Sequence, residues 1–276
     1  MRGGVAVGAI ALAVLAAGCA SSVLTAPVTF RNVTPGSSQE IVATLVRPSG
    51  EGPFPAVVQL HGCAGVEAQS YRWARWFADH GYVAMVVDSF GPRGLKGDCR
   101  EGPDEPPITA RFDDAFGALR YLQSLPYVDA SRIGLWGGSY GGLLTALGLA
   151  RNSDIFKAGV DFHGVHDWSA FLPRWFAFFS QEIKDVPDAE EARKLALESS
   201  PIASMKTWRS PVLLIQGDDD RNVPVPEEVD LVQRLREQKV ELDEILLPDE
   251  IHDFLLWRNW MRAYQATADF FEHRLK

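Results

Sequence analysis

A serine in a glycine-rich turn carries the most specific chemical signal in the sequence. Ser139 lies in Gly-Gly-Ser-Tyr-Gly-Gly, between an apolar strand pattern over 133–136 and a helical pattern over 143–150, and it satisfies G-x-S-x-G. Glycines lack a Cβ, so backbone segments approach closely and strained dihedrals are tolerated. The N-terminal amides of the following helix favour an oxyanion at the same place. The turn predicts a nucleophilic serine; a glycine-rich turn with an incidental serine is the alternative.

A carboxylate and a histidine follow the serine along the chain, each placed directly after a strand pattern. The adjacent acids Asp218, Asp219 and Asp220 come after the strand pattern 212–215, and His252 comes after the strand pattern 242–247. A serine hydroxyl is a poor nucleophile unless an imidazole takes its proton, and a carboxylate then fixes the tautomer of that imidazole. We therefore expect Ser139, His252 and one of these three aspartates to form a catalytic triad.

The remaining chain alternates strand-like apolar runs with helical patterns. This alternation predicts an α/β fold, a mostly parallel twisted sheet with helices on both faces. The expected strands are 41–46, 56–60, 82–87, 133–136, 158–162, 212–215 and 242–247. The expected helices are 71–80, one from Phe112, 143–150, one opened by Pro226-Glu227-Glu228 and one from about Leu255.

These motifs resemble a known superfamily. The run Gly217-x-x-Asp220-x-x-Val223-Pro224, with Ser139 in G-x-S-x-G-G and His252 ahead of an aromatic residue, resembles the α/β-hydrolase domain of the prolyl oligopeptidase and dienelactone hydrolase families over about residues 40–275. The resemblance implies the α/β-hydrolase fold. It also places the family's acid three residues after the glycine, at Asp220, with Asp219 as the alternative.

The oxyanion hole is expected to use two backbone N–H groups. One belongs to Tyr140, the residue after the nucleophile, and the other to the loop that follows the strand 56–60. That loop, His61-Gly62-Cys63-Ala64-Gly65, resembles the His-Gly oxyanion segment of lipases and esterases. We expect the Cys63 amide to be the second donor, with the Ala64 amide as the alternative.

Residues 166–208 are expected to form a small helical cap insertion over the active site. Their aromatic residues either pack as the cap core or line an acyl or aromatic substrate pocket. The apolar residues concerned are Trp168, Phe171, Leu172, Trp175, Phe176, Phe178 and Phe179, and Trp73, Trp76 and Phe77 are expected to add to the same region.

The first residues have the pattern of an export signal. A short positive start is followed by an apolar stretch too short to span a bilayer comfortably, and the ending Leu-Ala-Ala-Gly-Cys19 resembles a bacterial lipobox. We interpret residues 1–18 as a lipoprotein signal peptide, 19–26 as a tether and 27–276 as the hydrolase domain. Lipidation of Cys19 would attach an exported, periplasm-facing protein to the bacterial cell envelope, with the outer membrane favoured. A plain secretory signal is the alternative.

Export changes the interpretation of the other two cysteines. Cys63 and Cys99 would lie in an oxidising compartment, so a disulfide is expected, with two separate buried thiols as the alternative. A Cys63–Cys99 bond would brace the expected oxyanion loop.

Composition excludes several other classes of function. The chain has 27 Lys and Arg against 36 Asp and Glu, a net charge of −9, and no basic run, which argues against a nucleic-acid partner. The sequence contains neither a phosphate-loop nor a dinucleotide-binding motif, so no cofactor is expected. His163 and His166 with Asp161 and Asp167 could suggest a metal site, but no metal-binding motif supports one.

The sequence therefore predicts hydrolysis of a small carboxylic ester or lactone through an acyl-enzyme. The first alternative is a peptidase acting on short peptides. It is less favoured because prolyl oligopeptidases carry an N-terminal propeller, whereas only about 40 residues precede the hydrolase pattern here. Dienelactone hydrolases use a cysteine where this chain has Ser139. The second alternative is a catalytically idle lipoprotein that uses the fold for surface binding.

Overall fold

The computed structural model describes residues 23–97, 99, 108–178 and 188–276. The predicted signal peptide and Cys19 lie outside these residues, as do the side chains of 175–179 in the predicted cap. Among the described helices, none combines the length and apolarity that a membrane span requires.

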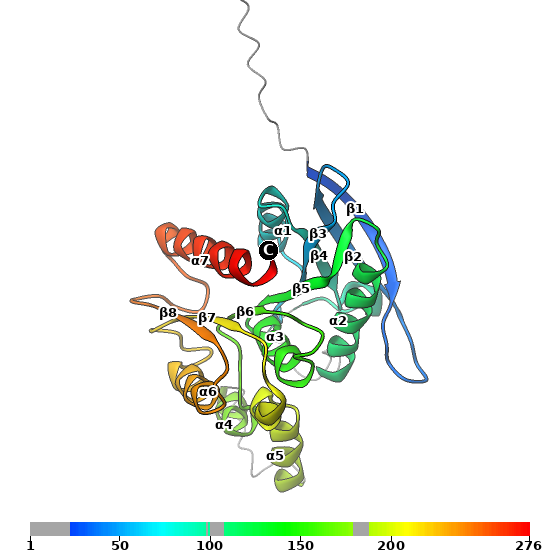
Figure 1. Ribbon diagram of the computed structural model, residues 1–276. Coiled ribbons are helices and arrows are strands. Elements are labelled where there is room, and N and C mark those ends of the chain that lie inside the picture. Colours follow the sequence, from blue (N-terminus) through cyan, green and yellow to red (C-terminus); the bar gives the residue numbers. More distant parts are fainter. Residues whose placement is uncertain (1–22, 98, 100–107, 179–187) are drawn as a thin grey trace, which may run out of the picture.

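Eight strands form one sheet, the seven that the alternating pattern predicts and one further strand at the N-terminal edge (Figure 1). Their order across the sheet is β1-β2-β4-β3-β5-β6-β7-β8. β1 and β2 pair antiparallel with each other, β2 pairs antiparallel with β4, and the strands from β4 to β8 run parallel. The strands are β1 (Val23–Arg31), β2 (Glu40–Pro48), β3 (Phe54–Leu60), β4 (Val83–Asp88), β5 (Val128–Gly138), β6 (Gly159–Phe162), β7 (Val212–Gly217) and β8 (Leu242–Leu247).

Helices cover both faces of the sheet (Figure 1). One face packs against α2 (Ile108–Gln123), α3 (Tyr140–Arg151) and α6 (Val225–Glu237). The other face packs against α1 (Ala68–Asp79) and α7 (Trp257–Leu275). Because both faces are covered, the central strands are mostly apolar, and six of the seven residues of β3 are buried.

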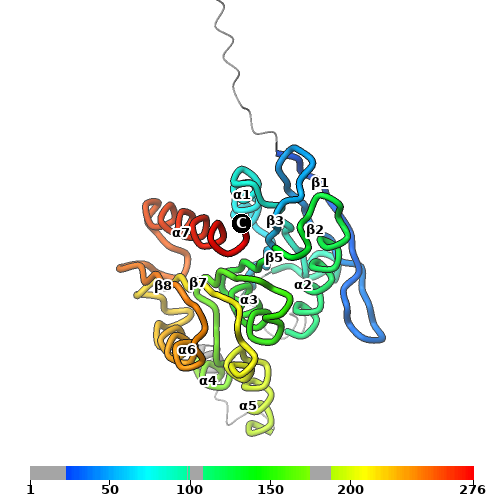
Figure 2. Tube along the Cα trace, viewed as in Figure 1, coloured from blue at the N-terminus to red at the C-terminus, as the bar shows by residue number. Residues whose placement is uncertain are grey.

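The segment between β6 and β7 leaves the sheet, as expected for an insertion (Figure 2). It holds α4 (Trp168–Phe178), α5 (Ala189–Glu198) and the 3₁₀ segment η3 (Pro201–Thr207). The backbone amide of Trp168 donates to Ser200 Oγ at 2.8 Å, so the insertion closes on itself at its base.

Two expectations about the edges of the domain differ from the structure. The expected tether over 19–26 overlaps β1, because Val23–Ala26 already pair with β2 in a regular antiparallel register. The aromatic residues of α1 do not join the cap. Trp73 is fully buried beneath α7, where its ring stacks on Tyr264 with centroids 3.7 Å apart. The helical period of α1 directs this aromatic face onto the sheet, and burying it there removes more apolar area from water than a surface loop would.

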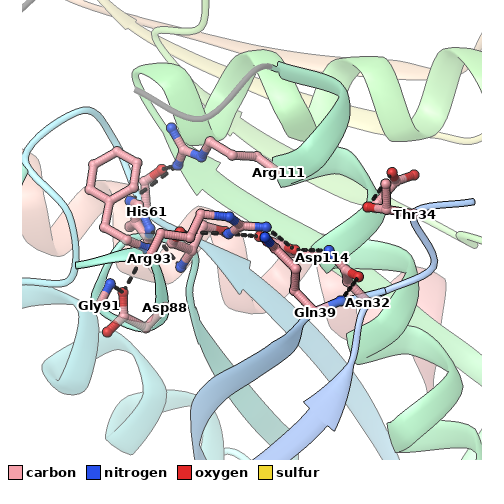
Figure 3. A network of polar contacts seen from close by, with 12 residues as sticks. Asn32, Thr34, Gln39, His61, Asp88, Gly91, Arg93, Arg111 and Asp114 are labelled. Atoms are coloured by element: carbon pink, nitrogen blue, oxygen red, sulfur yellow. Dashed lines mark hydrogen bonds and ion pairs between the residues drawn. The ribbon is translucent and has the colours of Figure 1, made fainter. Parts of the chain in front are cut away.

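A buried ion pair fastens the antiparallel edge to the parallel core (Figure 3). Arg93, in the 3₁₀ segment η1 (Gly91–Arg93), donates to both carboxylate oxygens of Asp114 on α2, at 2.8 and 3.0 Å. Asn32, next to β1, donates to the same carboxylate at 3.0 Å. The side chain of Asp114 is fully buried, and these three bonds compensate the desolvation of its charge.

Candidate active site

Ser139 occupies a strained turn between β5 and α3. Its φ of 56° and ψ of −120° lie in a region that side-chain-bearing residues rarely adopt. Two bonds hold this conformation: the Ser139 amide donates to the Phe162 carbonyl at 2.9 Å, and the Ser139 carbonyl accepts from the Leu143 amide at 3.1 Å. Ser139 is thereby fixed at the carboxyl edge of the sheet, directly before the N-terminus of α3.

The glycines around Ser139 let the turn pack against the neighbouring strand. A Cβ on Gly137 would overlap the backbone of Gly141, and a Cβ on Gly141 would overlap the carbonyl of Leu60 at the end of β3. The turn and the oxyanion segment that follows β3 are therefore in close contact. A Cβ on Gly62 in that segment would lie 3.5 Å from the Ser139 Cβ.

Asp220 and His252 meet across two neighbouring loops. The Nδ1 of His252 lies 2.6 Å from Oδ2 of Asp220, and the Asp220 side chain is fully buried. Asp220 also accepts from Gln216 Nε2 at 3.0 Å and from the amides of Asn222 and Val223 at 2.8 and 2.9 Å. Four polar contacts around one carboxylate fix its orientation.

The two neighbouring aspartates have other contacts. Asp219 forms an exposed ion pair with Arg221, and its amide donates to the Glu250 carbonyl at 3.0 Å. Asp218 accepts from the Asp249 amide at 2.7 Å. These bonds join the loop after β7 to the loop after β8, which keeps the Asp220–His252 pair in register.

Glu250 holds the loop after β8, which carries His252, through a buried carboxylate. The sequence did not indicate this role. The fully buried carboxylate of Glu250 accepts from the Leu255 and Leu256 amides and, at 2.6 Å, from Asn259 Nδ2. It thus satisfies amides at the start of α7 and pins the segment that carries His252. The only sequence signal was an acid shortly before a predicted helix.

His61 fixes the peptide that carries the Cys63 amide. Its Nε2 accepts from the Ser89 amide at 3.2 Å, so the proton resides on Nδ1, which donates to the Gly62 carbonyl at 2.7 Å. Burial, and then the nearby Arg111, lower the pKa of His61 to about 3, so the ring is neutral. Because carbonyl and N–H are antiparallel across a trans peptide, the Cys63 N–H points away from His61.

Arg111 braces the same segment from α2 (Figure 3). It donates through Nη2 to the His61 carbonyl, and its guanidinium lies over the rings of Tyr140 and Phe90, at 4.3 and 5.0 Å from their centroids. One buried cation thus contacts both the loop of Cys63 and the residue after Ser139. The sequence pattern gave no indication of this role.

A disulfide joins Cys63 to Cys99. Their Cα atoms are 5.0 Å apart, and the bond ties the oxyanion segment to the loop after η1. The alternative of two separate thiols is therefore excluded by the structure.

His163 and His166 do not meet at a common site. The ring of His163 faces that of His252 with centroids 4.0 Å apart and ring planes tilted by 31°, and donor atoms of His163, Asp220 and His252 lie within 4.8 Å of one another. The Nδ1 of His252 is already hydrogen-bonded to Asp220, and facing rings at this distance are typical of side-chain packing. The arrangement favours packing of one imidazole on another rather than metal ligation.

His166 belongs to a buried acidic cluster at the start of α6. Its Nε2 lies 2.8 Å from Oδ2 of Asp161, and its amide donates to Glu227 at 3.1 Å. Burial alone would lower the pKa of His166, but the carboxylates of Asp161, Glu227 and Glu228 outweigh it and raise this pKa. Burial raises the pKa of Glu228 to about 8.

The first turn of the cap packs beside the nucleophile turn. The Trp168 ring lies 6.4 Å from that of Tyr140, and Trp168 packs with Phe171, Val165 and Val223 in a small apolar cluster separate from the main core. Arg174 of α4 donates to the Arg221 carbonyl in the Asp220 loop. The described part of the cap therefore lies along the edge that carries Ser139 and Asp220.

The model of the prolyl oligopeptidase family matches residues 69–276, about three quarters of the chain. The chain belongs to this family. Its members and the similar proteins are serine hydrolases, which agrees with the α/β-hydrolase architecture and with the resemblance drawn from the sequence motifs.

Individual relatives are considerably longer than this chain. Dipeptidyl aminopeptidase BIII of Pseudoxanthomonas mexicana is 27% identical over 230 residues, which are 80% of this chain and 33% of that protein. The acylaminoacyl peptidase of Pyrococcus horikoshii superposes with a TM-score of 0.71 at 25% identity, covering 91% of this chain and 42% of the other. The chain spans about a third of the length of the curated relatives it matches.

A solved structure of another kind matches this chain over nearly its own full length. A dienelactone hydrolase-like promiscuous phosphotriesterase from metagenomic libraries superposes with a TM-score of 0.70, covering 91% of this chain and 99% of the other. At 19% identity this likeness shows the fold alone.

Glu228 gives a testable pH dependence. A carboxyl whose folded pKa is raised contributes stability below about pH 4.5 that is lost as the pH rises through about 8. Glutamine keeps the shape of the neutral acid and does not titrate. We therefore expect Glu228→Gln to be more stable than the parent by a margin that widens from pH 5 to pH 8 in urea unfolding. Glu237→Gln, an exposed change on the same helix, should show no such widening, and a constant margin for Glu228→Gln would contradict the prediction.

The disulfide gives a second test. Cys63→Ser and Cys99→Ser each open a loop of 36 residues and should cost about 3–4 kcal/mol in the free energy of unfolding. If the bond also braces an oxyanion donor, both variants should turn over ester more slowly under conditions where circular dichroism shows them folded, by at most about 100- to 1000-fold. Unchanged turnover in the folded variants would separate the disulfide from catalysis.

Proposed function

We propose that this chain hydrolyses carboxylic esters or lactones through an acyl-enzyme. Ser139 attacks the carbonyl carbon while His252 takes its proton, and Asp220 holds the imidazole through Nδ1. The resulting imidazolium protonates the leaving alkoxide, and a water activated by His252 then releases the acid. The observation that carries the proposal is the Asp220–His252 hydrogen bond at the sheet edge where the strained turn holds Ser139.

The oxyanion would be held by the amides of Tyr140 and Cys63. Tyr140 is the first residue of α3, where amides point out of the helix toward negative charge. The contact between Gly62 and Ser139, and the orientation that His61 imposes on the next peptide, support Cys63 as the second donor.

A peptidase acting on short peptides is the second candidate. It is favoured by the family match and by relatives named as peptidases, among them dipeptidyl aminopeptidase BIII. The same triad cleaves either bond, but an amide nitrogen must be protonated as it leaves, so peptides demand more exact placement of the imidazolium than activated esters do. A panel of p-nitrophenyl esters compared with aminoacyl and prolyl anilides distinguishes the two candidates.

Substitutions at two neighbouring aspartates test the proposed triad. Asp220→Asn should lower kcat by about 10³- to 10⁴-fold because the amide no longer fixes the His252 tautomer. Asp219→Asn, one residue away and exposed to solvent, should leave kcat within about twofold. A fluorophosphonate probe should label the parent and should not label Ser139→Ala. Equal losses in the two aspartate variants, or labelling that survives in Ser139→Ala, would overturn the assignment.

We further propose that the protein is exported and attached to the bacterial envelope through a lipid on Cys19. The lipobox-like ending of the leader and the Cys63–Cys99 disulfide, a bond typical of oxidising compartments, support export. Cys19→Ala should move the protein from the membrane fraction to the soluble fraction of a bacterial host. The parent in the soluble fraction would contradict lipidation, and reduced Cys63 and Cys99 in intact cells would contradict export.

A further inference from the structure

His163 is an unusual neighbour for a catalytic histidine. It follows β6 directly, at a φ of 42°, and its amide donates to the Ile215 carbonyl at 2.9 Å, which continues the pairing of β6 with β7. A histidine with positive φ carries backbone strain, which structures tolerate where the surroundings over-determine the conformation. The side chain is therefore fixed by the sheet rather than by a flexible loop.

The ring of His163 lies beside both the nucleophile turn and His252. It faces the His252 ring with centroids 4.0 Å apart and ring planes tilted by 31°, and the Phe254 ring contacts it edge-on at 5.7 Å. Its Nε2 lies 3.5 Å from the position that a Cβ on Gly138 would take, one residue before Ser139. His163 thus contacts the imidazole of His252 and lies close to the serine turn.

The ring is neutral and uses no strong polar contact. His163 is almost completely buried, and its Nδ1 has no hydrogen-bond partner among the described residues. Burial, and then the proximity of His252, hold the pKa of His163 well below its usual value. His252 in contrast has the Asp220 carboxylate as a hydrogen-bond partner, with Nδ1 and Oδ2 2.6 Å apart.

We infer that His163 is a positioning residue, a neutral aromatic plate that holds the ring plane of His252 and shields its inner face from water. Asp220 fixes one atom of the imidazole but leaves the ring free to tilt about that bond. Stacking on His163 removes this freedom, so Nε2 keeps one direction during both proton transfers. This inference rests on the proposed function of Ser139 and His252.

Two substitutions distinguish the contribution of the His163 aromatic ring from that of its ring nitrogens. Asparagine tolerates positive φ but has no ring, so His163→Asn should lower kcat by about 10- to 100-fold with KM nearly unchanged. Water reaching His252 would also favour its charged form, so the acidic limb of kcat/KM should move to higher pH. His163→Phe keeps a ring at the same place and should stay within about fivefold of the parent, with its acidic limb in place.

His166→Asn is the matched control, because His166 lies in the same loop and is equally buried but contacts Asp161 rather than His252. It should cost stability in urea unfolding without changing the fluorophosphonate labelling rate or the acidic limb of the folded enzyme. Equal labelling rates and unshifted acidic limbs for His163→Asn and the parent would overturn the inference. Absence of labelling in the parent would instead overturn the proposed function.

Discussion

The hydrogen bond between His252 and Asp220 is the contact on which the site depends. It joins residues 32 apart in the chain, and it exists because β7 and β8 are adjacent parallel strands whose loops leave at the same edge. Further bonds from Asp218 and Asp219 to the histidine loop keep the two loops in register. A shift between the strands would move the imidazole away from the carboxylate, so packing of α6 and α7 on the two faces supports the chemistry indirectly.

The site is built from opposite kinds of constraint. Ser139 is held in a strained backbone conformation by its neighbours on β6 and α3, and strain of this kind persists only where packing over-determines it. The oxyanion segment is instead held by favourable contacts: the His61 bond to Gly62, the guanidinium of Arg111 and the disulfide at Cys63. In the proposed mechanism, both kinds reduce the reorganisation that a developing oxyanion would otherwise require.

Buried histidines show how strongly position decides chemical character in this protein. His61, His163, His166 and His252 are all buried, yet their partners differ. His61 bonds to backbone groups and is neutral, whereas His166 faces carboxylates and its pKa is raised. His163 faces another imidazole. Residue type alone therefore says little about the pKa of a buried histidine, because burial and the surrounding charges set its direction of shift.

The sequence by itself predicted the order of elements from β2 onward and the glycine-rich turn at Ser139, because local periodicity and glycine spacing record them directly. The choice of Asp220 and His252 rested on a motif resemblance, and the structure brings these two side chains into contact. The sequence did not determine that Val23–Ala26 form an edge strand, that Trp73 packs under α7, or that His163, Glu250 and Arg111 support the site. These contacts join segments far apart in the chain, and no periodic pattern records which distant side chain will fill a given space. Only the packing of the sheet edge against its helices decided them.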